Sequence, residues 1–120
     1  MMITLETLQQ MFNNIRENTK WSIDGPMLWG YFFTDASANK LKDLVPILEA
    51  QGYRYVDMFI PKLDDGEDEY FFLHLEKEEV HTVESLNDRN QQLYALAEAY
   101  ELASYDGMDV GPISTEVTLQ

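Results

Sequence analysis

Two neighbouring stretches of alternating residues constrain the fold of this chain more than any other feature of its sequence. The first is YRYVDMFIP, residues 53–61, and the second covers residues 69–83. Apolar and polar side chains that alternate with a period of two indicate a strand with two different faces. Only KLDDGED separates the two stretches, and its Gly66 suits a turn that needs a positive φ angle. We therefore expect an antiparallel hairpin with an acidic loop.

Three other stretches repeat their apolar residues at the spacing of a helix, which predicts three helices. Their expected N-caps are Thr4 for the first helix, Ser37 or Asp35 for the second, and Ser85 for the third. The second helix should end near Gly52, because glycine adopts the left-handed conformation that closes many helices.

Two further strands complete the predicted elements. Residues 27–35, MLWGYFFTD, are typical of a buried strand, and residues 105–110 of a short edge strand. After the first helix the order is βαββαβ, which predicts an α+β fold of the ferredoxin-like type, with one antiparallel sheet and two helices on one face. We expect a single domain over residues 1–120, with an extra N-terminal helix in residues 1–20 and a ferredoxin-like core in residues 27–111.

Charge restricts the partners of this chain. The formal net charge is −14, of which residues 51–120 contribute −12 and residues 1–50 contribute −2. Nucleic-acid binding depends on Lys and Arg that neutralise phosphates, so a chain this acidic is expected not to bind nucleic acid directly. Its expected partner is a basic protein.

Composition indicates a folded protein outside the membrane. A hydrophobic content of 45% separates the chain from disordered acidic proteins, which lack the apolar area to fold. No apolar run approaches the roughly 20 residues that span a bilayer. The first residues, MMITLETLQQMF, lack the basic and apolar regions of a signal peptide, and without cysteine no disulfide can form. We expect a cytoplasmic protein.

Motifs for catalysis or cofactor binding are weak. The acidic loop does not match a calcium loop, since counting from Asp64 places Gly66 where a ligand is needed. His74 shares a strand face with Glu76 and Glu78, but no third ligand group stands at a suitable spacing for a metal. Phosphate-binding glycine motifs and nucleophile elbows are missing from the sequence. We expect no catalytic residue, metal or cofactor, and a small hydrolase or metal enzyme that uses His74 is the alternative.

Aromatic residues recur on the predicted strands. RNA-recognition domains stack bases on such residues, but they also carry basic residues where these strands carry acids. Two compatible expectations follow: the first helix covers the aromatic residues, or they dock a basic protein. The residues expected at that interface are Asp64, Asp65, Glu67, Asp68, Glu69, Glu76, Glu78, Glu79, Asp106 and Asp109, with the aromatics Tyr70 and Phe72.

Part of the sequence resembles the B-type regulators of ribonuclease E activity. The similarity covers roughly residues 27–111 and is strongest in SLNDRNQQLYALAEAYELASYDGMDVG, with further matches in WGYFFTD and LEAQGYRYVDMF. The resemblance implies a ferredoxin-like fold and a protein without a cofactor, which binds the endoribonuclease, inhibits its cleavage of RNA and alters the composition of the degradation complex. Such regulators tend to end in a long acidic tail, whereas ISTEVTLQ at the end of this chain contains one charged residue, Glu116.

The predicted function is therefore that of a non-enzymatic acidic protein that binds and modulates a ribonuclease. The alternative is an immunity-type or adaptor protein for another basic protein, such as a toxin nuclease. Self-association into a homo-oligomer is compatible with either function.

Overall fold

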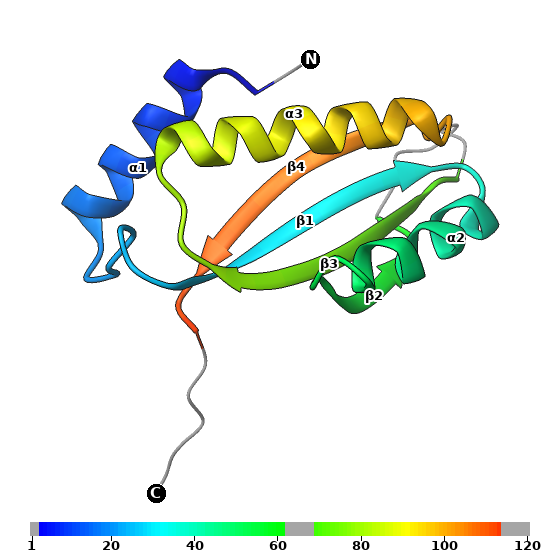
Figure 1. Cartoon of the computed structure of the whole chain (residues 1–120), viewed down its shortest axis with the longest axis horizontal. Helices are drawn as coiled ribbons and strands as arrows, with labels where there is room; N and C mark the ends of the chain where they lie inside the picture. The colour runs from blue at the N-terminus through cyan, green and yellow to red at the C-terminus, as the bar shows by residue number, and fades with distance from the viewer. Residues whose placement is uncertain (1–2, 62–68, 114–120) are drawn as a thin grey trace, which may run out of the picture.

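A computed structural model describes residues 3–61 and 69–113 of the chain. The elements, in order along the chain, are α1 (Leu5–Asn18), β1 (Met27–Asp35), α2 (Ala38–Glu49), β2 (Arg54–Phe59), β3 (Phe71–Glu79), α3 (Val83–Ala99) and β4 (Ser104–Gly111) (Figure 1). Four residues of the predicted acidic interface, Asp64, Asp65, Glu67 and Asp68, lie outside the described residues.

The strands form one antiparallel sheet in the order β2-β3-β1-β4. The predicted pairing of the hairpin strands β2 and β3 is confirmed, and β1 lies between β3 and β4. Within residues 3–61 and 69–113, this arrangement confirms an α+β fold with three helices and an antiparallel sheet of four strands.

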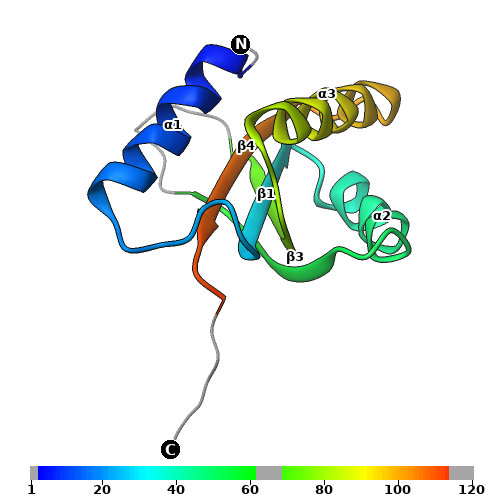
Figure 2. The same cartoon turned by 60° about the vertical axis from the view of Figure 1, so that its left-hand side comes forward.

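One face of the sheet builds the core together with the helices. Trp29, Tyr31 and Phe33 of β1 are fully buried, and across the ladder Tyr31 opposes Leu75 while Phe33 opposes Leu73. The apolar stripes of α2 and α3 pack over these side chains, so the odd-numbered residues of β1 and β3 define the helix-covered face. Figure 2 shows both helices on the same side of the sheet.

A bulge in β2 changes the predicted alternation of that strand. The ladder with β3 shifts between Tyr55 and Asp57, so that Tyr55 opposes Leu75 whereas Phe59 opposes Phe72. Strict alternation over residues 53–61 predicts that Tyr55, Asp57 and Phe59 share one side, and the bulge shows this to be wrong, because it separates Tyr55 from the other two. An extra residue in a strand reverses the direction of every side chain that follows it.

Helix α3 begins earlier than the sequence predicts. Thr82, and not Ser85, is the N-cap, and its side chain accepts a hydrogen bond from the Ser85 backbone N–H. The Ser85 hydroxyl in turn accepts a hydrogen bond from the backbone N–H of Thr82, which completes a capping box. The prediction took the second member of this reciprocal pair for the first.

Helix α1 packs against α3 and the start of β1 rather than across the outer face of the sheet (Figures 1 and 2). Phe12 is fully buried, and its ring stacks on Trp29 with centroids 6.1 Å apart. The Trp29 indole N–H has no acceptor among the described residues, so the contact depends on apolar burial. None of the described helices is long and apolar enough to cross a membrane.

Candidate protein-docking face

The face of the sheet opposite α2 and α3 is the candidate functional site, and we refer to it as the open face. It is formed by the side chains that alternate with the buried ones, as the strand registers define them. The open-face residues with a charge or a ring are Phe32, Arg54, Asp57, Phe59, Phe72, His74, Glu76, Glu78, Asp106 and Asp109.

Aromatic rings from three strands meet on the open face, near the end of β2 and the start of β3. Phe59 of β2 stacks on Phe72 of β3 with centroids 5.3 Å apart and an angle of 10° between the planes. Phe32 of β1 meets Phe72 edge to face at 6.4 Å and stacks on His74 at 4.4 Å. Phe59 is 37% exposed, so the cluster is accessible to a partner and differs in this from the core aromatics.

A hollow of about 300 Å³ lies beside this cluster. Its walls are Phe32, Phe59 and Phe72 on one side and the β4 residues Asp106, Gly107 and Met108 on the other. Gly107 has a φ angle of 128°, a conformation that side-chain-bearing residues rarely adopt. The residues that line the hollow thus include three aromatic rings and one carboxylate, that of Asp106.

Gly30 makes room for two polar groups next to the cluster. A Cβ atom at this position would lie 2.4 Å from Asp109 Oδ1 and 2.8 Å from His74 Nε2. Gly30 pairs with Asp109 of β4 on one side and with Glu76 of β3 on the other. Because it has no side chain, it leaves a gap on the open face between these two neighbours. The ends of His74 and Asp109 occupy that gap.

The charge of the open face is strongly negative. One basic residue, Arg54, lies on this face. The acidic residues on it are Asp57, Glu76, Glu78, Asp106 and Asp109. Arg54 forms an ion pair with Glu76, whereas the described residues provide no ion pair for Asp57, Asp106 or Asp109. Burial raises the pKa of Asp106 above its usual value. Unpaired carboxylates beside apolar rings would gain from a cationic partner.

The predicted interface residues are only partly brought together. Glu76, Asp106, Asp109 and Phe72 lie on the open face, Glu78 lies at its end, and Tyr70 contacts Phe72 with centroids 5.7 Å apart. Glu69 is exposed just before β3.

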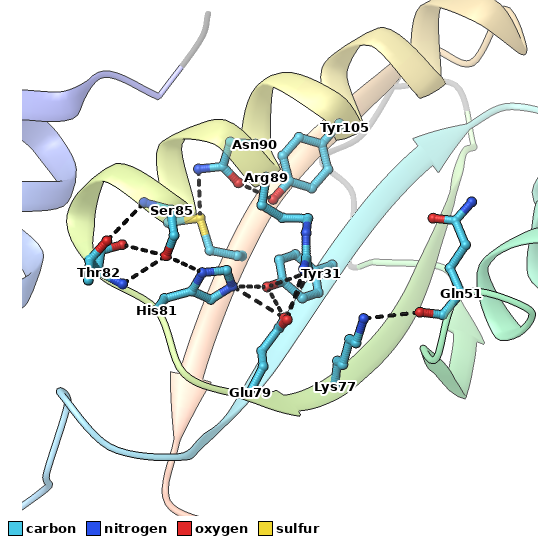
Figure 3. A network of polar contacts seen from close by, with 11 residues as sticks. Tyr31, Gln51, Lys77, Glu79, His81, Thr82, Ser85, Arg89, Asn90 and Tyr105 are labelled. Carbon is cyan, nitrogen blue, oxygen red and sulfur yellow. Dashed lines mark hydrogen bonds and ion pairs between the residues drawn. The ribbon is translucent and has the colours of Figure 1, made fainter.

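Glu79 has a different environment, because it points to the helix-covered side (Figure 3). Arg89 of α3 donates two hydrogen bonds to its carboxylate, each 2.9 Å long, and the Tyr31 hydroxyl donates a third of 2.6 Å. His81 Nε2 lies 3.3 Å from the same carboxylate, and its Nδ1 contacts the Ser85 hydroxyl at 2.9 Å. Glu79 is thus part of an internal network and is not available to a partner, which corrects its predicted place at the interface.

The network fixes the protonation of Glu79, Arg89 and Tyr31. Burial alone would raise the pKa of Glu79, but the hydrogen bonds from His81, Arg89 and Tyr31 outweigh it and lower the pKa to about 2. Burial and the hydrogen bond to Glu79 raise the pKa of the Tyr31 phenol, so this group stays a neutral donor. The pair of Glu79 and Arg89 therefore remains ionised and anchors α3 to β3.

The predicted interface left out five residues of the open face, namely Phe32, Gly30, Arg54, Asp57 and Phe59. The alternation within MLWGYFFTD contained a signal for Phe32, since it separates Phe32 from Trp29, Tyr31 and Phe33. Asp57 and Phe59 could not be placed because the bulge lies between them and Tyr55. In the part of the chain that the structure describes, no three His, Asp or Glu side chains come together as a metal site.

Comparison with known families gives a match that covers nearly the whole fold. The family model described as regulator of ribonuclease activity B matches residues 5–110, from the start of α1 almost to the end of β4. A search of curated proteins gives no match.

Proposed function

The chain belongs to the regulator of ribonuclease activity B family, and we propose that it acts by binding a ribonuclease E-type enzyme through the open face. The family is one of regulators and not of catalysts, so the chain is proposed to act without chemistry of its own. The observation that carries the choice of surface is the cluster of Phe32, Phe59 and Phe72, which no described helix covers and which carboxylates border.

Charge supports a basic, RNA-binding segment of the ribonuclease as the target. Lys and Arg that hold RNA phosphates match the acids of the open face, so the regulator and RNA would compete for them. The acids speed the encounter through long-range attraction, while each exposed ion pair adds only about 0–1 kcal/mol. The aromatic rings supply the lasting contact, because apolar anchors dominate interface energetics.

The fold and location belong to the same proposal. The order β2-β3-β1-β4, with one helix between β1 and β2 and another between β3 and β4, supports the ferredoxin-like class predicted from the sequence. The chain would meet its ribonuclease in the cytoplasm.

The test compares two single substitutions of equally exposed aromatic residues. Phe59, which is 37% exposed on the open face, is changed to Ala, and Tyr100, which is 40% exposed beside α3, is changed to Ala as the matched control. Binding to the purified ribonuclease is measured by biolayer interferometry, and cleavage of a labelled RNA is followed in parallel. We expect Phe59→Ala to weaken binding by about tenfold and to relieve the inhibition of cleavage, whereas Tyr100→Ala binds like the wild type.

A second pair of variants tests the charge. Asp57, Asp106 and Asp109 are changed to Asn, and three exposed acids on the helices, Asp43, Glu49 and Glu98, are changed to amides as the control. Both variants lose three negative charges, so a difference in association rate reports position and not net charge. Equal slowing by both would reject the open face as the docking surface, and capture of a different basic protein would favour the immunity or adaptor function.

A further inference from the structure

We infer that the hollow beside the aromatic cluster accepts an arginine side chain of the partner. The inference rests on the proposed function and names the group that its docking surface would recognise. Three features support it: the ring faces in the wall, the carboxylate on the rim, and the pairing of the arginines of this chain elsewhere.

The ring geometry suits a planar cation. Phe59 and Phe72 are parallel within 10°, and Phe32 meets Phe72 at 72°. The hollow is therefore lined by two parallel stacked rings and by a third ring that stands nearly perpendicular to Phe72. A guanidinium group stacks on an aromatic face with a gain of about 0.5–1 kcal/mol at an exposed site.

The carboxylate of Asp106 is placed to pair with the charge of a guanidinium group in the hollow. Asp106 lines the same hollow as the three rings and makes no ion pair with any described residue. The residues that line the hollow include no Lys or Arg. Partial burial raises the pKa of Asp106, and a cation beside it would offset that effect by stabilising the carboxylate.

The occupant comes from another protein. The three arginines of this chain already pair with carboxylates: Arg16 with Asp24, Arg54 with Glu76, and Arg89 with Glu79. An arginine of the same chain, or of a second copy, would have to leave its carboxylate to enter the hollow. A basic partner carries arginines without that cost, which favours it over self-association.

Arginine is preferred to lysine for a geometric reason. A guanidinium group presents a flat face to the rings and two parallel N–H groups to a carboxylate at the same time. The lysine ammonium is a strongly hydrated point charge, so it would satisfy Asp106 only by losing water or contact with the rings.

The experiment uses the full chain labelled with ¹⁵N and three short peptides as probes. Each peptide carries one central residue, arginine, lysine or citrulline, between capped glycines, and citrulline has the shape of arginine without its charge. Amide shifts are followed up to the solubility limit of the peptides. We expect the arginine peptide to shift the amides of Phe32 and Gly107 and to bind about fivefold more tightly than the other two.

Two variants and a control locate the effect. Asp106→Asn should remove the preference for arginine over citrulline, and Phe59→Leu should remove the preference for arginine over lysine, because it keeps the apolar bulk but loses the ring. Glu98→Gln, on the helix-covered side, should bind all three peptides like the wild type. Equal affinities for the three peptides, shifts confined to other regions, no shifts at all, or an unchanged preference in Asp106→Asn would each overturn the inference.

Failure of the inference and failure of the proposed function give different results. If the ribonuclease binds the open face but the peptides show no arginine preference, the function stands and the arginine site is rejected. If the arginine preference depends on Asp106 but the ribonuclease does not bind, the site stands and the partner is another basic protein.

Discussion

Glu78 and Glu79 are neighbours in the sequence, but their carboxylates meet opposite environments. Strand β3 directs Glu78 to the exposed side and Glu79 to the side of α3, where its side chain is only 13% exposed. The cost of desolvating Glu79 is offset by Arg89, His81 and Tyr31, and its pKa of about 2 records the balance. At the scale of a residue, strand parity separates the exposed Glu78 from Glu79, which the internal network binds.

This difference predicts the acid sensitivity of the protein. The pKa of Glu79 falls from 4.5 to about 2 on folding, which corresponds to about 3 kcal/mol of stability. A lowered pKa stabilises the folded state above the unfolded value, so this contribution is complete above about pH 4.5 and is lost as the pH falls towards 2. We expect Glu79→Gln to unfold at lower urea concentration at pH 7 and to approach the wild type near pH 2.

Glu78→Gln is the matched control for this experiment. It removes the same charge one residue earlier, and we expect the free energy of unfolding to change by less than about 0.5 kcal/mol. Equal losses in the two variants at pH 7 would show that net charge, and not the network of Glu79, produces the effect.

Helix α1 shows how an element can be attached through a few side chains. The residues of α1 that are buried are Leu8 and Phe12, and Phe12 stacks on Trp29. Their contacts place α1 on the side of α3, so it leaves the rings of Phe32, Phe59 and Phe72 uncovered. At the scale of an element, the docking of α1 against α3 is what keeps the open face open.

A pair of substitutions within α1 measures this attachment. Phe12→Ala removes a fully buried ring and should lower the free energy of unfolding by about 3–5 kcal/mol. Leu5→Ala changes a residue that is 49% exposed on the same helix and should cost less than about 0.5 kcal/mol. Both are measured by chemical denaturation, and similar small losses would show that α1 does not contribute to the stability of the core.

Charge is the property that acts on the whole molecule. At a net charge of −14 the acidic side chains repel one another, and some of them lie beside the aromatic cluster of the open face. Salt screens exposed charges over about 8 Å at physiological ionic strength, whereas the partly buried pair of Glu79 and Arg89 is screened less. Screening should therefore relieve the repulsion more than it weakens the internal network.

Salt is expected to have opposite effects on stability and on binding. Sodium chloride should raise the Tm of the free protein, because it weakens repulsion among the acids, and should slow association with the ribonuclease, because it weakens attraction to a basic partner. Differential scanning calorimetry and association rates over one salt series measure both. A Tm that falls with salt would contradict the dominance of repulsion, and an association rate that ignores salt would contradict electrostatic steering.

By itself, the sequence determined the elements and their order. The alternation in residues 53–61 and 69–83 predicted the hairpin, and helical spacing predicted the three helices. Thr4 is an N-cap as predicted, and of the two candidates for the second helix Ser37 is the N-cap. These signals are local, because hydrophobic period and capping depend on residues a few positions apart. The family was also accessible, since its similarity lies in contiguous motifs.

Tertiary structure alone decided which side chains form the candidate site. The bulge after Tyr55 turns Asp57 and Phe59 to the open face, and the contact of Arg89 with Glu79 withdraws one acid from it. Both depend on partners far apart in the chain: register is set between strands, and an ion pair joins a strand to a helix. The pattern of residues along the chain does not determine such pairings, because the same alternation is compatible with more than one register and the packing of the core decides between them.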